Sequence, residues 1–142
     1  MSIRNVQVKD KLAVTNVAEI CAPLVRASVV GTYEYLARCF QNTFFVYEDN
    51  DEIVGYIVGF PNTNVPGEFW LYQVAVIGSQ RGKKIGSQLF ERFMNQVKAE
   101  GYEKIRSHYI FGNERSAKIH EKYGFKACGE DERGPFVESK LK

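Results

Sequence analysis

A strand, a basic loop and an amphipathic helix follow one another within residues 71–90, and this stretch constrains the fold more than any other. Residues 71–77 (LYQVAVI) form an almost unbroken apolar run whose composition predicts a buried strand. A loop follows over residues 78–84 (GSQRGKK), and beyond it apolar residues recur every four positions, which predicts a helix. The apolar face of that helix consists of Ile85, Leu89, Phe93 and Val97.

The junction between this loop and the helix has the properties of an anion-binding site. The first N–H groups of a helix have no partner within it, and the helix dipole places partial positive charge there. Arg81, Lys83 and Lys84 add full charges, and Gly82 and Gly86 leave room for a ligand at the backbone. We therefore expect a pyrophosphate to bind here. The alternative is an ordinary solvated basic loop, since neither GxxxxGKS/T nor GxGxxG occurs in the chain.

The same loop resembles the acyl-CoA-binding motif of the GNAT family of N-acetyltransferases. That motif reads Arg/Gln-x-x-Gly-x-Gly/Ala directly after the fourth strand, and it maps here to Arg81, Lys84 and Gly86. Lysine thus replaces the middle glycine, which leaves the local backbone geometry open but adds positive charge. The resemblance implies acetyl-CoA as co-substrate. It assigns to the coenzyme Val74, Ala75, Val76, Arg81, Gly82, Lys83, Lys84, Ile85, Gly86 and Ser87.

Residues 113–125 (NERSAKIHEKYGF) resemble a second segment of that family, Asn-x-x-(Ala/Ser)-x-x-x-Tyr-x-Lys-x-Gly-Phe. The family pattern implies that Asn113 reaches the pantetheine arm of the coenzyme. It also implies that His120, which stands where the family has tyrosine, faces the coenzyme sulfur. Asn113 is equally suited to cap a helix, and the two roles are compatible because capping uses only part of the amide. For His120 the alternative is an ordinary packing or surface histidine.

The reaction implied by the resemblance is direct attack of an amine on the acetyl thioester in a ternary complex. The amine must lose a proton, the oxyanion needs a donor such as the N–H near Val76, and the thiolate needs a partner. His120 is the predicted thiolate partner, mostly neutral above pH 7. The base candidates are Glu68, acting through water, and Tyr72, with His108 a weaker third. Glu68 is alternatively a solvated strand-edge carboxylate and Tyr72 a wall of the acceptor pocket, so the sequence alone assigns no base.

The rest of the chain predicts the order β-α-α-β-β-β-α-β-α-β-β. The strands are expected at residues 3–8, 43–48, 52–60, from 68 onward, 104–111, 125–128 and 136–141. Asp10 is expected to cap the first helix, and Gly101 and Gly124 to end the last two. Hairpins followed by crossover helices indicate an α/β (α+β) fold. Together with the resemblance, this predicts one domain over residues 1–142, with a mostly antiparallel sheet of about seven strands and about four helices.

The composition limits the classes of partner and metal site that we expect for the chain. A formal net charge of +2 in 142 residues gives no support for a nucleic acid or an anionic membrane as main partner. Cys21, Cys39 and Cys128 form no CxxC pair, and with two histidines no metal-ligand cluster is expected. The N-terminus lacks the apolar region of a signal peptide, and no apolar run approaches membrane-spanning length. We therefore expect a cytoplasmic location.

Residues 21–82 also resemble one branch of the GNAT family, the diaminobutyrate acetyltransferases. The shared segments are CAPL (21–24), YEYL (33–36), Cys39, IVGY (53–56) and QVAV (73–76). The chain departs from that branch at residues 25–28 (VRAS), where the branch carries an aspartate, and at Tyr72, where it carries tryptophan. These departures imply a related scaffold with a changed acceptor. Arg26 would favour an acceptor with a carboxylate or phosphate, unless it is a surface charge at a helix end.

The leading hypothesis is an N-acetyltransferase acting on the primary amine of a small molecule, such as an amino acid or a diamine. One alternative is a protein N-terminal or lysine acetyltransferase, and another is a sensor that binds acyl-CoA without turnover. Several aromatic residues favour a closed pocket and hence a small acceptor: Tyr33, Tyr35, Trp70 and Tyr72. A homodimer paired through the C-terminal strands would also suit this family.

Overall fold

The structure, a computed structural model, describes residues 2–80 and 83–142, in which seven strands and four helices follow the predicted order. The strands are β1 (Ser2–Asn5), β2 (Phe44–Asp49), β3 (Glu52–Pro61), β4 (Glu68–Val76), β5 (Lys104–His108), β6 (Lys126–Glu130) and β7 (Pro135–Lys140). The helices are α1 (Lys11–Cys21), α2 (Val30–Cys39), α3 (Ile85–Ala99) and α4 (Glu114–Lys122). The predicted fold class is confirmed.

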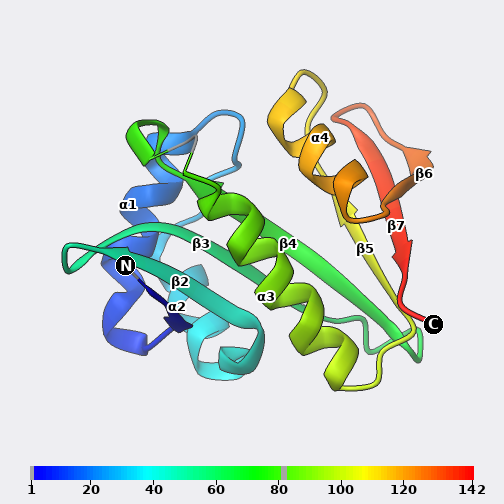
Figure 1. The fold of residues 1–142 in the computed structure, drawn as a ribbon, viewed down its shortest axis with the longest axis horizontal. Helices are drawn as coiled ribbons and strands as arrows, with labels where there is room; N and C mark the ends of the chain where they lie inside the picture. Colours follow the sequence, from blue (N-terminus) through cyan, green and yellow to red (C-terminus); the bar gives the residue numbers. More distant parts are fainter. Residues whose placement is uncertain (1, 81–82) are drawn as a thin grey trace.

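One sheet runs through the molecule in the order β1-β2-β3-β4-β5-β7-β6 (Figure 1). All neighbours are antiparallel except β4 and β5, which are parallel. This parallel pairing joins residues 68–71 to residues 104–107, whereas β4 continues to Val76. The two strands diverge beyond the paired region, and α4 lies beside the divergence (Figure 1). The second half of β4 therefore has an edge that β5 does not cover.

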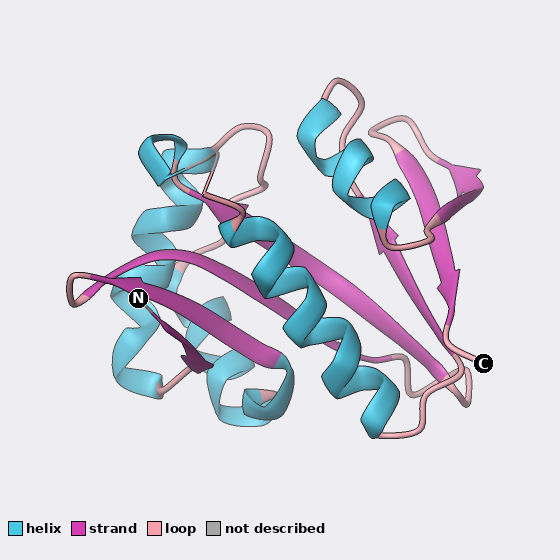
Figure 2. Cartoon of the chain, viewed as in Figure 1, coloured by secondary structure: helices cyan, strands magenta, loops and turns pink. Residues whose placement is uncertain are grey.

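Both faces of the sheet are apolar, and each is covered by helices. Along β2, Phe44 and Val46 belong to a core shared with α1 and α2, whereas Phe45 and Tyr47 belong to a core shared with α3. This two-residue alternation is the pattern of a strand buried on both sides. Figure 2 shows α3 crossing one face, with α1 and α2 on the other. No helix of the described residues is both long and apolar enough to cross a membrane.

A glycine on β3 sets how closely α3 approaches the sheet. A Cβ atom added to Gly59 would meet the carbonyl oxygen of Trp70 and would lie 2.5 Å from the ring of Phe93 on α3. Real Cβ atoms do not approach other atoms so closely, so Gly59 is required for this packing. The close approach fixes the position of α3, whose first turn forms part of the candidate site.

Two details near the N-terminus differ from the predictions. β1 ends at Asn5 rather than at residue 8, because Val8–Asp10 form a 3-10 turn. Asp10 has helical φ and ψ and makes no capping bond to α1. Its carboxylate instead accepts hydrogen bonds from Arg4 at 2.8 and 3.0 Å and from the N–H of Gln7 at 2.8 Å.

The fifth strand is also shorter than predicted. β5 ends at His108 rather than at residue 111, because the chain turns at Gly112, which has φ +89°, and the N–H of Asn113 bonds to the carbonyl of Ile110 at 3.2 Å. The predicted helix ends are confirmed. Gly101 and Gly124 have φ values of +89° and +84°, the left-handed conformation that glycine adopts without strain after a helix.

Candidate active site

Two cavities meet where β4 and β5 diverge. The larger, which we call the groove, has a volume of about 420 Å³ and lies between the end of β4, the start of α3, α4 and the segment after α1. The smaller, which we call the inner cavity, has a volume of about 250 Å³ and lies between β4, β5 and the β6–β7 loop. Both are lined by Leu24, Val25, Val74, Asn113 and Ser116. A ligand in the groove and another in the inner cavity would therefore touch near Val74 and Asn113.

The groove is basic. Lys84 at the start of α3 lines it, together with Arg115, Lys118 and Lys122 of α4. The three α4 residues lie three and four positions apart, so they share one side of the helix. Sequence reasoning missed them, although this spacing was visible in the chain. Lys122 Nζ also donates to Ser87 Oγ at 3.3 Å, which links α4 to the first turn of α3.

The coenzyme residues predicted from the sequence divide into three groups. Six of them line the groove together, and they are Val74, Ala75, Val76, Ile85, Gly86 and Ser87. Lys84 and Asn113 line it as well. Lys83 is exposed, and its ammonium donates to Gln80 Oε1 at 2.9 Å rather than lining the groove. His120 likewise does not line the groove but lines the inner cavity. Arg81 and Gly82 lie outside the described residues.

The backbone at Lys84 has the conformation expected of the glycine that the motif has at this position. Its φ of +60° and ψ of +24° are left-handed, the conformation that a glycine in the motif would adopt without cost. A side chain at such a position costs roughly 1–2 kcal/mol. The chain thus keeps the backbone geometry of a glycine turn while placing a cation at the groove.

Replacing Lys84 by glycine is expected to raise the free energy of unfolding by about 1 kcal/mol, because the left-handed strain disappears. Urea unfolding at pH 7 measures the change. Lys83→Gly is the matched control, because Lys83 carries the same charge on the neighbouring residue but does not have a positive φ. This variant should be neutral or destabilising. If Lys84→Gly were as destabilising as the control, the strain would have been misassigned.

The edge of β4 that β5 does not cover, which we call its free edge, presents backbone groups to the site. The N–H of Ile77 donates to the carbonyl of Val54 at 3.0 Å, so Ile77 faces β3. Because backbone groups of successive strand residues point to opposite edges, those of Val74 and Val76 face the side of β4 away from β3. The carbonyl of Val76 accepts there from Cys21 Sγ at 3.4 Å. This is the direction that the predicted oxyanion donor near Val76 requires.

Asn113 caps α4 as predicted and still has donors to offer. Its Oδ1 accepts from the N–H of Ser116 at 3.2 Å. Its side-chain NH₂ group is not used by the cap, and the residue lines both cavities. The geometry therefore allows a capping role and a ligand contact at once.

His120, the predicted thiolate partner, is buried beside the inner cavity and does not line the groove. The side chain is 1% exposed. Nδ1 lies 2.7 Å from the carbonyl oxygen of Ser116, which can only accept, so Nδ1 carries the proton. Nε2 then accepts from the hydroxyl of Ser107 at 2.8 Å. Burial lowers the pKa of His120 to about 4, although the bond to Ser116 favours the charged form. The ring is neutral at pH 7 with both nitrogens occupied, which favours the packing alternative.

Glu68 is held in a buried cluster of polar and charged groups outside both cavities. It is only 3% exposed, lies at the start of β4 and does not line the inner cavity. Its Oε2 accepts from Asn62 at 2.6 Å and from Trp70 at 2.8 Å, and its Oε1 lies 3.3 Å from Arg106 Nε. Burial alone would raise its pKa, but these bonds and charges, with that of Lys104, outweigh burial and lower the pKa. The alternative of a solvated strand-edge carboxylate was wrong, because Glu68 is buried. Its role as a base stays a prediction, although the residue lines neither cavity.

Glu68→Gln is expected to lower the free energy of unfolding at pH 7 by about 2 kcal/mol, because Arg106 and Lys104 lose their buried charged partner. The variant should leave kcat within about threefold, because it changes no group that lines a cavity. Because the folded-state pKa is depressed, this contribution is full above the unfolded pKa of about 4.3 and disappears as pH falls below it. Urea unfolding at pH 7 and pH 3 measures the difference. A hundredfold loss of kcat with unchanged stability would restore Glu68 as the base.

The aromatic walls are partly those predicted. Trp70 and Tyr72 line the inner cavity, and the hydroxyl of Tyr72 lies 3.0 Å from Ser28 Oγ, as suits a wall. Tyr33 is fully buried in the core, where its hydroxyl donates to Gln73 at 2.8 Å, and Tyr35 is 70% exposed. The expectation that these two tyrosines form walls was wrong, because α2 turns one into the core and the other to solvent.

His108 is the residue of the inner cavity best suited to accept a proton. Its Nε2 lies 2.9 Å from Asp131 Oδ1 and 3.2 Å from the carbonyl oxygen of Gly134, and its ring packs on Phe136 with centroids 4.6 Å apart. Both partners of Nε2 are acceptors, so in the neutral ring the proton is on Nε2 and Nδ1 has an unprotonated lone pair. No protein partner of Nδ1 is found in the described part of the chain. Sequence reasoning did not identify Asp131, which reaches this site from the β6–β7 loop.

Comparison with known proteins agrees with this architecture. The model of the acetyltransferase (GNAT) family matches residues 15–125. The chain is 39% identical over 68 residues to the L-2,4-diaminobutyric acid acetyltransferase of Virgibacillus pantothenticus, a match that covers 46% of this chain and 43% of that protein. It spans about half the length of the curated relatives that it matches.

Two solved structures share the fold. Diaminobutyrate acetyltransferase EctA from Paenibacillus lautus, in complex with L-2,4-diaminobutyric acid and coenzyme A, has a TM-score of 0.87 at 21% identity, covering 99% of this chain and 95% of that one. Ard1 from Thermoplasma volcanium has a TM-score of 0.87 at 21% identity, covering 99% and 97%. The family match covers most of the chain, and the fold similarity is nearly complete. The chain therefore belongs to the acetyltransferase (GNAT) family.

Proposed function

We propose that residues 1–142 act as one domain that transfers an acetyl group from acetyl-CoA to the primary amine of a small molecule. The observation that carries the proposal is the meeting of two cavities at the free edge of β4, one basic and one enclosed by aromatic walls. Groove and inner cavity would hold the two substrates of a direct transfer, and holding them in contact supplies much of the acceleration.

The groove suits the coenzyme in charge and in shape. The diphosphate of acetyl-CoA would lie at the first turn of α3, where N–H groups and the helix dipole favour anions, beside Lys84 and Lys122. The pantetheine arm would follow the free edge of β4 to Asn113, whose NH₂ group is available to it. In this arrangement the thioester reaches the boundary of the inner cavity at Val74.

The acetyl transfer then needs one proton acceptor on the amine side. We assign this role to His108, because its unprotonated Nδ1 belongs to a ring that lines the inner cavity while Nε2 is held by Asp131. The first proton of the ammonium group passes to Nδ1, and the nitrogen then attacks the thioester carbonyl. The carbon–sulfur bond breaks, and the thiolate that leaves takes the second proton that the nitrogen loses as the amide forms. A backbone N–H near Val76 would stabilise the oxyanion. We assign no proton donation to His120.

Small-molecule acceptors are favoured over proteins by the size of the inner cavity, about 250 Å³, and by its aromatic walls. The likeness of fold, at 21% identity to both EctA and Ard1, does not identify the acceptor. A protein N-terminal or lysine acetyltransferase is therefore the second candidate. A homodimer stays a prediction; β6, at the edge of the sheet, is exposed along its length and has room for a partner strand.

Calorimetric titration with acetyl-CoA tests the groove, and a thiol-release assay over a panel of amines tests the transfer. We expect micromolar binding that weakens at least tenfold when the ligand lacks the diphosphate, as in acetyl-pantetheine. Release of coenzyme A must depend on an added amine. A protein that binds acetyl-CoA but never releases thiol with any amine or peptide would be a sensor rather than a transferase.

A further inference from the structure

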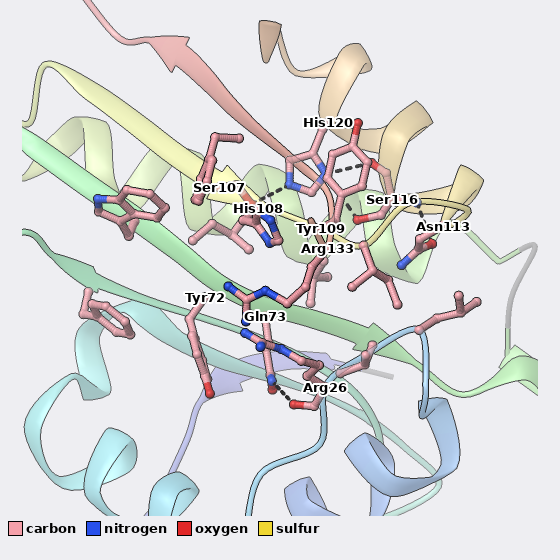
Figure 3. A pocket seen from close by; sticks show the side chains of 18 residues that line it. Arg26, Tyr72, Gln73, Ser107, His108, Tyr109, Asn113, Ser116, His120 and Arg133 are labelled. Carbon is pink, nitrogen blue, oxygen red and sulfur yellow. Dashed lines mark hydrogen bonds between the residues drawn. The ribbon is translucent and has the colours of Figure 1, made fainter. Parts of the chain in front are cut away.

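The inner cavity contains two arginine side chains and no carboxylate. Arg26 enters from the segment between α1 and α2, and Arg133 enters from the β6–β7 loop. Figure 3 shows both side chains directed into the cavity from its two sides. None of the residues that line the cavity is an aspartate or a glutamate. Two cations thus face a partly enclosed space whose own walls do not neutralise them.

The charges of the two arginines are compensated only in part. Arg133 Nη2 lies 3.1 Å from Asp131 Oδ2. Asp131 also accepts from His108 and from the N–H groups of Arg133 and Gly134, so its single charge is shared among several donors. Arg26 forms no ion pair with any carboxylate of the described residues. One net positive charge therefore remains at the cavity without a protein partner.

The position of Arg26 is built by buried groups. Gln73 Nε2 donates to the backbone carbonyl of Arg26. Gln73 Oε1 in turn accepts from the hydroxyls of Tyr33 and Tyr56, each at 2.8 Å, and both tyrosines are fully buried. Tyr33 also accepts from the N–H of Ser28 at 3.1 Å. A buried network on β4, β3 and α2 thus fixes the backbone of the segment that carries Arg26, while the arginine residue itself is exposed.

We propose that the acceptor is an amine that also carries an acidic group, held between Arg26 and Arg133, with its amine directed to His108. This inference rests on the proposed function and names its substrate class. Arginine pairs readily with carboxylate and with phosphate, so the shared requirement is an oxyanion of either kind. A second ammonium group on the acceptor would face the same arginines. Acceptors of zero or negative net charge are therefore favoured over diamino acids of net charge +1.

Matched pairs of acceptors test the requirement. β-Alanine is compared with β-alaninamide, and ethanolamine phosphate with ethanolamine, so that each pair differs only in the acidic group. Glutamate is compared with 2,4-diaminobutyrate, which has the opposite net charge at pH 7. We expect kcat/KM to be at least tenfold higher for the acidic member of one of the first two pairs, which also tells carboxylate from phosphate, and higher for glutamate than for diaminobutyrate. Equal values within each pair, or a preference for diaminobutyrate, would overturn the proposal.

Variants assign the effect to the two arginines. Arg26→Met and Arg133→Met should each raise KM for the preferred acidic amine about tenfold, with kcat within about threefold. The KM for the matched amine that lacks the acidic group should not change. Arg38→Met is the control, because Arg38 lies on the surface of α2, paired with Glu34, away from both cavities. Acetyl-CoA titration of every variant verifies the fold. KM values unchanged in both cavity variants would contradict the assignment.

Failure of this inference is distinguishable from failure of the proposed function. If acetyl-CoA binds and amines without an acidic group are acetylated as fast as acidic ones, the proposed transferase function stands and the oxyanion requirement is wrong. If no amine is acetylated, the proposed function is wrong. Calorimetric titration of the protein and coenzyme A with glutamate and ethanolamine phosphate then decides whether the two arginines form an oxyanion-binding site. Binding that both arginine variants lose would support an oxyanion site, and no binding to the wild-type protein would overturn it.

Discussion

Gly86→Glu is expected to weaken acetyl-CoA binding at least a hundredfold while leaving the protein folded. A Cβ at Gly86 would lie 3.5 Å from Ile119 Cδ1 and 3.9 Å from Val76 Cγ2, which are ordinary contacts. A carboxylate in the first turn of α3 is favourable to the helix dipole, so stability should not suffer. The same carboxylate would repel a diphosphate bound there. Two like charges about 6 Å apart at an effective dielectric constant of about 20 repel by about 3 kcal/mol, a factor of more than 100 in affinity.

Gly86→Ala is the matched control for this prediction. Its methyl group makes the same ordinary contacts without charge, so the affinity for acetyl-CoA should fall less than tenfold. Alanine in a helix is favoured over glycine by up to about 1 kcal/mol, so the variant should be at least as stable as the wild type. Calorimetric titration and urea unfolding measure both quantities. Unchanged affinity in the glutamate variant would remove the start of α3 from the coenzyme site.

His108→Asn is expected to lower kcat by about 10²–10³ without changing acetyl-CoA affinity, because the variant loses the lone pair at Nδ1 while its amide can still bond to Asp131. Initial rates with a saturating amine measure the effect. A merely structural role for the ring would lower activity with every acceptor alike. A base, in contrast, is needed only when the amine is protonated.

The second arm of this test therefore uses a weakly basic acceptor. An amine whose pKa lies below 7 is already unprotonated at neutral pH, so the loss caused by His108→Asn should shrink at least tenfold for such an acceptor. Asp131→Asn, which keeps the shape of the partner and removes its charge, should show a smaller loss of kcat in the same direction. Equal losses with weakly and strongly basic amines would remove His108 as the base.

Patterns within short stretches of the sequence predicted the fold and the coenzyme side of the candidate site. The run of residues 71–77 and the four-residue apolar spacing of α3 were sufficient for the strand, the helix and the basic junction between them. Asn113 was correctly predicted as a helix cap. These features depend on residues close in sequence, whose periodicity and capping chemistry are readable without the tertiary structure.

The acceptor side could not be predicted in the same way, because it is assembled from distant segments. The parallel pairing of β4 with β5 brings the partly exposed cations of Arg106 and Lys104 to Glu68, so the carboxylate is buried beneath two cations instead of solvated at an edge. The β6–β7 loop brings Asp131 and Arg133 to His108. No spacing in the sequence encodes these contacts. The left-handed backbone of Lys84 was equally hidden, since lysine gives no signal for positive φ.

The central claim is direct acetyl transfer between two ligands that meet at the free edge of β4. The measurement that tests it most directly is the initial rate of thiol release as a function of both acetyl-CoA and acceptor amine, with the acetylated amine verified by mass. The account predicts double-reciprocal lines that intersect, because both substrates must be bound before the carbon–sulfur bond breaks. Parallel lines, which indicate an acetylated enzyme intermediate, or the absence of thiol release with every amine, would contradict it.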